Sequence, residues 1–509
     1  MCHPVHDPGH ALGPYLVLPC PVRAAPPEAR DQGAHAGNRF VSDPMNHPMD
    51  RIANPPAATA PPAVSFREAL RFWWQLGFIS FGGPAGQIAI MHRELVERRR
   101  WVSEKRFLHA LNFCMLLPGP EAQQLATYLG WLMHRTRGGV AAGALFVLPS
   151  LVLLIALSWI YMAYGQQPLI AGIFYGIKPA VAAIVLHALH RIAGKSLGNP
   201  LQAPVPWLIA VLSFLAIGAL HLPFPVVVLS ALLTGAVLAR LAPAALGRGG
   251  AHAANGNTPH APAVIDDNTP TPAHALFSGA RLASVLGVGA ALWLLPMAAL
   301  LLSHGWSGTL TQIGWFFTKA ALLTFGGAYA VLPYVNQAAV EHYQWLTTAQ
   351  MMDGLALGET TPGPLIMVVA FVGFVGGWVK QVAGPDALFA GAALAACVAT
   401  WFTFLPSFIF ILAGGPWVES TRGNLKLTVP LAAVTAAVVG VIANLALFFI
   451  AAVAYPSGAN GLFGTHPDGI ALALVGVAAL ALWRLKWGVI RVIGAAAAAG
   501  LLLRAFGLA

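Results

Sequence analysis

Charged side chains are scarce in this sequence. Asp, Glu, Lys and Arg make up 9% of its 509 residues, whereas they make up about a quarter of a typical soluble protein. Hydrophobic residues contribute 57% of the chain. Because so few charges cannot cover the surface of soluble domains of this total length, the composition excludes an ordinary soluble protein and predicts a membrane protein.

Cysteine pairs and the fingerprints of common enzymes are also missing. The four cysteines, Cys2, Cys20, Cys114 and Cys397, form no CxxC pair, so neither a disulfide framework nor a zinc site is expected. The sequence has no GxxxxGK[ST] or HExxH motif. We therefore expect no cofactor, no bound metal, no ATP-driven pump within this chain and no enzymatic activity; a membrane-embedded enzyme is the distant alternative.

Long apolar runs, each bounded by proline, glycine or charged residues, are what the sequence has in abundance. They are typical of membrane-spanning helices, because the strands of a membrane barrel are shorter and alternate in polarity. The predicted fold class is therefore an all-α polytopic integral membrane protein with about 13 transmembrane helices. The expected spans lie near residues 68–91, 107–133, 139–164, 168–190, 204–221, 223–241, 282–302, 310–335, 349–375, 386–414, 427–453, 468–484 and 486–506.

Polar segments divide the chain into four parts. Residues 1–65 lack an apolar stripe and are expected to be a disordered N-terminal extension that includes alternative starting methionines. Residues 66–241 form the first group of helices. Residues 242–281 are rich in Pro and His and are expected to be a flexible linker. Residues 282–509 form the second group, which has one extra leading helix.

Two similar stretches, beginning at Phe78 and Leu322, indicate an internal duplication. About 40 residues match without a gap, and each matched pair is 244 positions apart. The segments VLPS at 147–150 and FLPS at 404–407 extend the similarity with a shifted spacing. The matched pairs are Ser80 with Thr324, Phe81 with Phe325, Gly82 with Gly326, Gly83 with Gly327, Trp101 with Trp345, and Pro118, Gly119 and Pro120 with Pro362, Gly363 and Pro364.

The two copies differ in charge in the loop that follows the first motif. The first loop contains Arg93, Arg98, Arg99, Arg100, Lys105 and Arg106. The equivalent residues 336–350 contain no Lys or Arg. Because cytoplasmic loops are enriched in these residues, the two loops are expected on opposite sides of the membrane, which predicts an inverted-topology repeat. The net charge of +10 therefore indicates topology and not nucleic-acid binding.

Both copies carry a Pro-Gly-Pro motif inside an apolar run. Pro118 and Pro120 lack an N–H group and clash with the preceding turn, so the helix must break there. The next helix would begin with free N–H groups near Glu121 and Gln123, and such a helix end is partly positive and binds anions. Residues 362–364 repeat this geometry, so two positive ends could face each other at the midplane. The alternative is a kink that only helps the helices to pack.

The Phe-Gly-Gly motifs at 81–83 and 325–327 have two interpretations. Their small residues allow close helix packing, or they form a second break whose exposed backbone lines the site. Ionisable residues inside apolar runs are costly and often functional. Lys319 either contacts a bound anion or a carboxylate, or reaches the membrane surface. Arg191, which follows His187 and His190, resembles a helix end at that surface. The candidates for proton coupling are Glu121, Asp353 and Glu359.

The sequence resembles a known family at these motifs. The segments SFGGPAGQIAIMHRELVERRRW and LLPGPEAQQLATYLGW, and in the second half TFGGAYAVLPYVNQAAVEHYQWLT and TTPGPL, closely resemble the chromate ion transporter family of the long two-domain type. The resemblance covers residues 66 to 506. It implies export of chromate from the bacterial cytoplasm and chromate resistance, and some relatives have been linked to sulfate. Ala328 replaces a proline of the second copy, which leaves the equivalence of the two half-sites open.

Together, the residues and the resemblance predict a multi-pass secondary active transporter of the bacterial cytoplasmic (inner) membrane that exports chromate and confers chromate resistance, with proton coupling as an option. The alternatives are a transporter for sulfate or another oxyanion, or a channel. The expected partners are the dianion and the lipid bilayer, no nucleic acid is expected, and a homodimer is left open. The predicted substrate-binding residues are Ser80, Phe81, Gly82, Gly83, Pro118, Gly119, Pro120, Glu121, Gln123, Lys319, Thr324, Phe325, Gly326, Gly327, Thr361, Pro362, Gly363 and Pro364.

Overall fold

The computed structural model of the chain describes most of residues 62–507. The residues outside this description are 1–61, 82, 166, 242–261, 268, 326, 421–427, 456–466, 508 and 509. Nearly all of the predicted N-terminal extension and about half of the predicted linker therefore lie outside the described residues, so the predictions for residues 1–61 and 242–261 stay predictions. All described residues belong to one unit, residues 58–509.

The described residues form α-helices almost throughout, with one isolated β-bridge between Val102 and Ile265. Six of the helices, α4, α5, α7, α8, α13 and α14, are long and apolar enough to cross a membrane. The predicted all-α polytopic membrane protein is thereby confirmed. The α-helices are α1 (Phe66–Ile79), α2 (Gly83–His92), α3 (Glu104–Leu116), α4 (Glu121–Tyr164), α5 (Pro168–Ser196), α6 (Pro204–Gly218), α7 (Phe224–Leu241), α8 (Gly279–His304), α9 (Thr309–Leu323), α10 (Ala328–Asn336), α11 (Thr348–Thr360), α12 (Val368–Val379), α13 (Leu388–Ser420), α14 (Thr428–Ala454), α15 (Gly469–Trp483) and α16 (Val489–Ala505). Short π-helices, η1 (Arg93–Arg98) and η3 (Gln337–His342), and 3-10 turns, η2 (Ala273–Ala275), η4 (Leu365–Met367) and η5 (Pro385–Ala387), join them.

Several predicted spans are each built from two short helices. The span 68–91 is α1 and α2, 310–335 is α9 and α10, and 349–375 is α11 and α12. The first two break at Gly83 and Gly327, whose φ angles of +69° and +96° cannot belong to a right-handed helix. The longest of these short helices, α9, has 15 residues. It is about 23 Å long, less than the ~30 Å of a hydrocarbon core, so none of them crosses a bilayer alone.

Helix α4 contains a sharp reversal. His134 and Arg135 have non-helical backbone angles in the middle of its 44 residues. A side chain on Gly130 would collide with Gly138 and Ala142, so the two segments on either side of the reversal fold back against each other. The separate spans predicted at 107–133 and 139–164 therefore correspond to real segments, of which the first is α3 and the beginning of α4.

The backbone repeats itself at the spacing seen in the sequence. The π-helices η1 and η3 begin at Arg93 and Gln337, and the two residues are 244 positions apart. Arg100 and Gln344, again 244 positions apart, have left-handed φ angles of 51° and 52°. Such unusual conformations would not recur at one spacing by chance, so the duplication extends to the fold.

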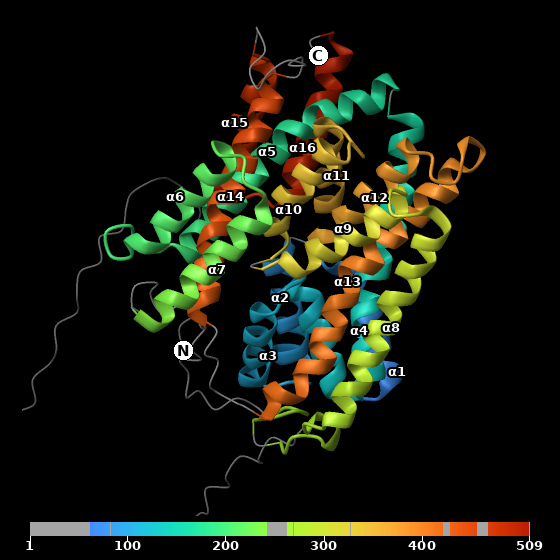
Figure 1. Cartoon of the computed structure of the whole chain (residues 1–509). Coiled ribbons are helices and arrows are strands. Elements are labelled where there is room, and N and C mark those ends of the chain that lie inside the picture. Colours follow the sequence, from blue (N-terminus) through green and yellow to red (C-terminus); the bar gives the residue numbers. More distant parts are fainter. Residues whose placement is uncertain are drawn as a thin grey trace, which may run out of the picture. The chain divides into compact units, whose positions relative to one another are not determined.

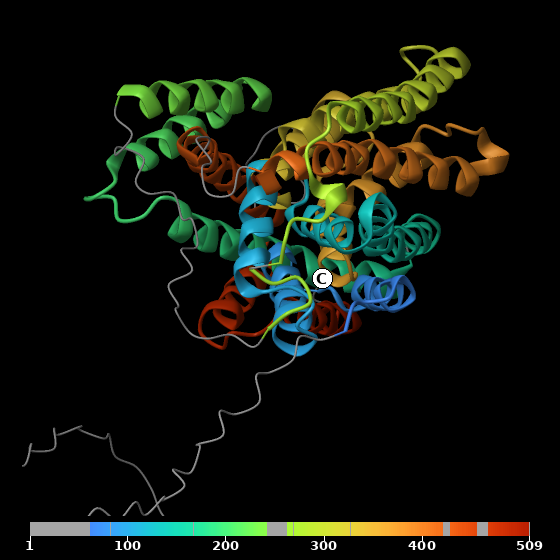
Figure 2. The same cartoon turned by 90° about the horizontal axis from the view of Figure 1, so that it is seen from below.

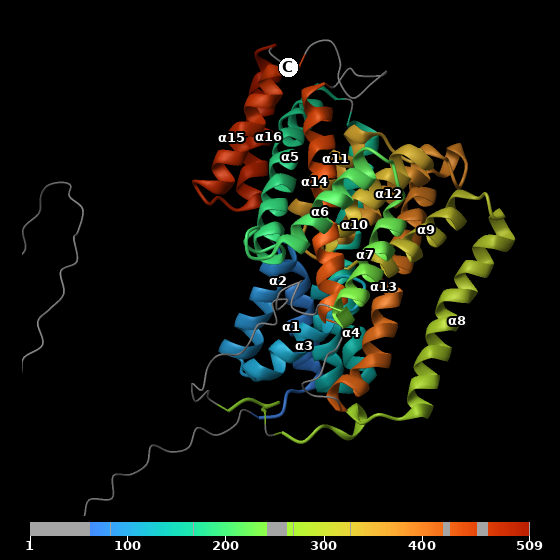
Figure 3. The ribbon, with the colours of Figure 1, turned by 60° about the vertical axis from the view of Figure 1, so that its left-hand side comes forward.

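The leading helices of the two copies lie on opposite sides of the centre of the helix bundle. Figures 1 and 3 show α1, α2 and α3 in one half of the bundle and α9 to α12 in the other. Helices α4 and α13 pack against each other and run through both halves. An inverted repeat would place its leading helices in this way, and the inversion itself stays a prediction.

The two copies also exchange their last helices. Helix α5 of the first copy packs against α15 and α16, whereas α14 of the second packs against α6 and α7. Glycine permits the close approach, since a side chain on Gly176 would collide with Ala496, and one on Gly440 would collide with Ala210. Helix α8 has no counterpart in the first copy and lies at the edge of the bundle (Figures 2 and 3).

Part of the predicted linker is folded against the first copy. The Ile265 N–H donates to the Trp101 carbonyl at 3.0 Å, and the Ser103 N–H donates to the Ile265 carbonyl at 3.0 Å. Arg106 donates to the carbonyl oxygens of residues 266 and 269 and forms a buried salt bridge of 2.7 Å with Glu419 at the end of α13. From residue 262 onward the chain thus differs from the expected flexible linker, because these contacts fix it.

We expect Arg106→Gln to lower the free energy of unfolding by about 3–5 kcal/mol, since it leaves a buried carboxylate without its cation. Arg98→Gln is the control. The Arg98 side chain is 67% exposed and pairs at 2.7 Å with Glu94, which also lies 3.6 Å from Arg99 and so keeps a cation. An exposed cation of this kind contributes at most about 1 kcal/mol. The measurement is thermal unfolding of the purified proteins in detergent. Equal shifts in the two variants would contradict the structural role of Arg106.

Candidate functional site

The broken regions of the two copies are hydrogen-bonded to each other. The Gly119 N–H donates to the Thr324 carbonyl at 2.7 Å, and the Gly363 N–H donates to the Ser80 carbonyl at 2.8 Å. Gly119 is equivalent to Gly363, and Ser80 to Thr324. Each Pro-Gly-Pro motif is therefore bonded to the Phe-Gly-Gly region of the opposite copy. We call these four residues the central junction.

Only glycine fits the two donor positions of the central junction. Gly119 and Gly363 have φ angles of +127° and +106°, which strain any residue with a side chain. A Cβ atom on Gly363 would lie 2.7 Å from the Cβ of Ser150, and one on Gly119 would collide with Ser407. Ser150 and Ser407 are the last residues of the repeated VLPS and FLPS segments. The sequence comparison thus aligned them with each other, but it did not predict that they belong to the site.

Glutamine side chains brace the central junction. Gln87 of α2 donates from Nε2 to the carbonyl of Gly363 and thereby links the two copies a second time. Gln124 donates to the Pro118 carbonyl at 2.8 Å and lies 3.5 Å from the hydroxyl of Ser407. Neither Gln87 nor Gln124 was predicted for the site. Their side-chain oxygens are buried and have no hydrogen-bond partner among the described residues, which leaves acceptors free for water or a proton donor.

Two of the three predicted proton-coupling residues lie at the breaks. Glu121 begins α4, and its carboxylate oxygen lies 3.7 Å from where a Cβ of Gly327 would be. Glu359 is buried near the end of α11 and accepts a hydrogen bond from the hydroxyl of Tyr329. One carboxylate thus comes from each copy.

Asp353, the third residue predicted for proton coupling, is paired with residues of other helices. Its carboxylate accepts a hydrogen bond from the Tyr161 hydroxyl at 2.8 Å and lies 3.7 Å from the Lys178 ammonium group. The residue is almost fully buried on α11, six residues before Glu359. This pairing joins α11 to α4 and α5.

Helix α5 supplies positive charges that the sequence analysis missed. Arg191 and Lys195 attract Glu359 and Glu121, respectively, over a distance longer than a salt bridge, since neither pair is among the salt bridges of the described residues. The predicted span ended at residue 190 and placed Arg191 at the membrane surface. In the structure, α5 continues to Ser196, so both cations belong to the same helix as Lys178. Lys178 thus forms an ion pair with Asp353, whereas Arg191 and Lys195 act on the other two carboxylates only at longer range.

Four helical segments begin at the four breaks, two of which lie in each copy. These are α2, α4, α10 and the η4–α12 segment, whereas α1, α3, α9 and α11 end there. In α4 the first bonded N–H is that of Gln124, which donates to the Pro120 carbonyl at 2.9 Å. The preceding N–H groups of the helix have no intrahelical partner and form a partly positive end.

The remaining predicted residues have different environments. Gln123 is buried and donates to the Thr127 hydroxyl at 3.0 Å, and the Thr361 hydroxyl donates to the Gly358 carbonyl at 3.2 Å. Phe81 and Phe325 are half-buried beside the breaks, and Pro118, Pro120, Pro362 and Pro364 frame the junction glycines. Gly82 and Gly326 lie outside the described residues. The described residues contain no group of three His, Cys, Asp or Glu side chains able to hold a metal ion.

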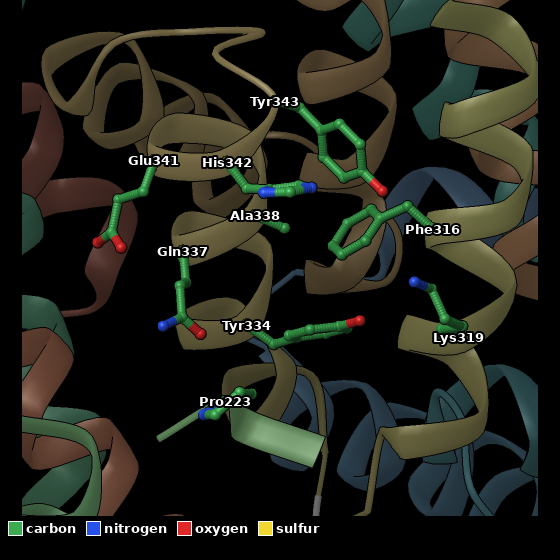
Figure 4. Close-up of a pocket in the computed structure, with 9 residues that line it drawn as sticks. All are labelled: Pro223, Phe316, Lys319, Tyr334, Gln337, Ala338, Glu341, His342 and Tyr343. Atoms are coloured by element: carbon green, nitrogen blue, oxygen red, sulfur yellow. The ribbon is translucent and has the colours of Figure 1, made fainter. Parts of the chain in front are cut away.

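Lys319 is not part of the central junction. It is half-buried on α9, and its ammonium group lies 5.8 Å from the ring of Trp315. It lines a pocket of about 410 Å³ with residues of α10 and η3, which Figure 4 shows. None of the three predicted carboxylates lines this pocket. The structure therefore separates Lys319 from the residues with which it was grouped.

We expect Gly363→Ala to destabilise the protein more than Gly384→Ala does, by about 1–3 kcal/mol. Both glycines have left-handed φ angles, +106° and +84°, but a Cβ on Gly384 meets no atom within 4 Å. The control thus contains the backbone strain without the collision at the central junction. Thermal unfolding in detergent measures the difference, and equal destabilisation would contradict the close packing of Gly363 against Ser150.

Comparison with known proteins agrees with this architecture. The sequence profile of a family described as chromate transporter matches residues 67–236 and 311–501, one segment in each copy. A chromate transport protein of Pseudomonas aeruginosa is 33% identical over 450 residues, which cover 87% of this chain and 94% of that protein. A chromate transport protein of Cupriavidus metallidurans is 30% identical over 404 residues, 78% of this chain and 86% of the relative.

A third relative, a probable chromate transport protein of Synechococcus elongatus, is 30% identical over 383 residues, 75% of this chain and 84% of that protein. No solved structure shows a significant match. The profile covers both copies of the repeat and more than half of the chain. The chain therefore belongs to the chromate transporter family.

Proposed function

We propose that this chain is a secondary active transporter that exports chromate across the bacterial cytoplasmic membrane. The observation that carries the proposal is the central junction, in which broken helices from two oppositely placed copies meet, in a chain of the chromate transporter family. Transporters built from inverted repeats bind substrate near the membrane midplane at such broken helices. Rearrangement of the two copies then exposes the site to each side in turn.

The substrate fits the charges at the breaks. Chromate is a tetrahedral dianion, and the unpaired N–H groups that begin α4 provide a partly positive end for it. Arg191 and Lys195, which both belong to α5, add two full positive charges. Both cations already interact with carboxylates, Arg191 with Glu359 and Lys195 with Glu121. A dianion that enters must therefore compete with these carboxylates for the cations.

This competition offers a mechanism for proton coupling. When Glu121 or Glu359 takes up a proton, its charge is lost and the cation on α5 becomes available to the anion. When the carboxylate is ionised, it reclaims the cation and favours release of the anion. Proton uptake and anion binding are then linked by a shared electrostatic interaction.

The membrane potential favours the proposed direction. Moving one elementary charge across 100 mV changes the free energy by about 2.3 kcal/mol. Export of a dianion from a negative cytoplasm therefore gains about 4.6 kcal/mol per 100 mV. Uptake of the same ion would have to overcome this energy, which supports export.

The test is uptake of radiolabelled chromate and sulfate into everted membrane vesicles, with and without an imposed proton gradient. We expect the wild type to accumulate chromate, with weak competition from sulfate. Glu121→Gln should lower uptake at least tenfold although the protein still reaches the membrane, because an amide cannot exchange a proton. Glu97→Gln is the matched control and should transport normally, since the carboxyl side chain of Glu97 is 59% exposed in η1.

Each outcome has a definite meaning. Accumulation of sulfate alone would favour the alternative cargo, another oxyanion carried by the same architecture. Normal chromate uptake by Glu121→Gln would remove Glu121 from the mechanism. Uptake that never exceeds the electrochemical equilibrium of chromate would indicate a channel. A change in the oxidation state of chromium caused by the purified protein would instead support the enzyme alternative.

A further inference from the structure

The pocket that contains Lys319 has the features of an anion site of its own. It lies between α9, α10 and η3 and encloses about 410 Å³. A smaller pocket of about 240 Å³ adjoins it and shares Lys319, His342 and Tyr343 as lining residues. The volume is ample for a tetrahedral oxyanion with part of its hydration shell.

Lys319 brings an unused positive charge to this pocket. The salt bridges found among the described residues do not include Lys319, whose ammonium group lies over the ring of Trp315, 5.8 Å from its centroid. An ammonium group that is half-buried without a carboxylate partner keeps its full attraction for an anion.

Two hydroxyl groups converge with this charge. Figure 4 shows the Lys319 nitrogen and the hydroxyl oxygens of Tyr334 and Tyr343 pointing into the same part of the pocket. The carboxylate of Glu341 points to the opposite side, away from Lys319. The three groups can each donate a hydrogen bond to an oxyanion, and the acidic residue of the lining does not oppose them.

Aromatic packing holds both tyrosines in place. The ring of Tyr343 is stacked on Trp345, with centroids 4.5 Å apart and planes inclined by 6°. The ring of Tyr334 stacks on Phe224 at 5.4 Å and contacts Phe316 at 5.0 Å. The hydroxyl groups are thus positioned before any ligand arrives, which lowers the entropy lost on binding.

The first copy of the repeat has no such site. The positions equivalent to Lys319, Tyr334 and Tyr343 are Gln75, Ile90 and Arg99. Arg99 lies over the rings of Phe72 and Trp101 and close to Glu94, so its charge is already used. The three donors are therefore particular to the copy whose loop lacks arginine.

We propose that Lys319, Tyr334 and Tyr343 form a second oxyanion site, which holds a tetrahedral dianion between the central junction and the membrane face opposite the arginine-rich loop. Lys319 lies in the last turns of α9, and Thr324 of the central junction, five residues later, directly follows this helix. In an exporter this is a release site, which the anion occupies after it leaves the breaks. The proposal rests on the proposed function for the identity of the anion, but not for the existence of the site.

The test is equilibrium binding of radiolabelled chromate, sulfate and phosphate to the purified full-length protein in detergent. We expect Lys319→Gln to weaken the binding of one ion at least about tenfold, and Lys319→Arg to keep the affinity within about threefold of the wild type. Tyr343→Phe removes one hydroxyl but keeps the stacked ring, and should weaken binding about threefold to tenfold. Glu341→Gln is the matched control from the same pocket and should bind at least as tightly as the wild type.

Thermal unfolding of each variant checks that the fold is kept, and Tyr343→Phe serves if Lys319→Gln is unstable. Unchanged affinity and stoichiometry for all three anions in Lys319→Gln and Tyr343→Phe would overturn the proposal. Binding of sulfate or phosphate that depends on Lys319, in a protein that does not transport chromate, would support the pocket and contradict the proposed cargo. Chromate transport without any binding that depends on Lys319 would support the function and reject the pocket.

Discussion

Backbone hydrogen bonding across the central junction is the constraint on which the rest of the structure depends. A helix that breaks inside a membrane leaves N–H and C=O groups that no water can satisfy, at a cost of several kcal/mol for each group. Here the N–H groups of Gly119 and Gly363 donate to the carbonyls of Thr324 and Ser80. Each copy thus supplies the hydrogen-bond partner that the other lacks. The two junction glycines suit this mutual requirement, because their left-handed φ angles strain any other residue.

The two copies share a backbone but differ in their charged side chains. The counterpart of Glu121 in the second copy is Leu365, and the counterpart of Glu359 in the first copy is Met115. Lys319 likewise has an uncharged counterpart. A symmetric scaffold suits two conformations of similar energy, because exchanging the roles of the copies costs little. The charged residues, which differ between the copies, then give the two conformations different affinities for the anion and for protons.

The sequence predicted the parts of this arrangement that are encoded locally. Proline lacks an N–H group wherever it stands, so the break at residues 118–120 followed from the motif alone, and the repeat followed from direct comparison of the two halves. The hydrogen bond between Gly119 and Thr324 was not predictable, because it joins residues that are distant in the sequence. The attraction between Arg191 and Glu359 was not predictable either, because α5 and α11 are distant in the sequence and meet only in the folded chain.

The inverted placement of the two copies is the central claim, and side-specific cysteine labelling tests it most directly. Arg98 and His342 are equivalent, both are exposed, and they lie in η1 and η3. Single cysteines at these positions, in a background without the native cysteines, would be treated in intact cells with a maleimide that cannot cross the membrane. We predict that His342→Cys is labelled from outside and Arg98→Cys only after permeabilisation, because the positive-inside rule predicts that the arginine-rich loop faces the cytoplasm. Labelling of both positions from the same side would contradict the inverted repeat.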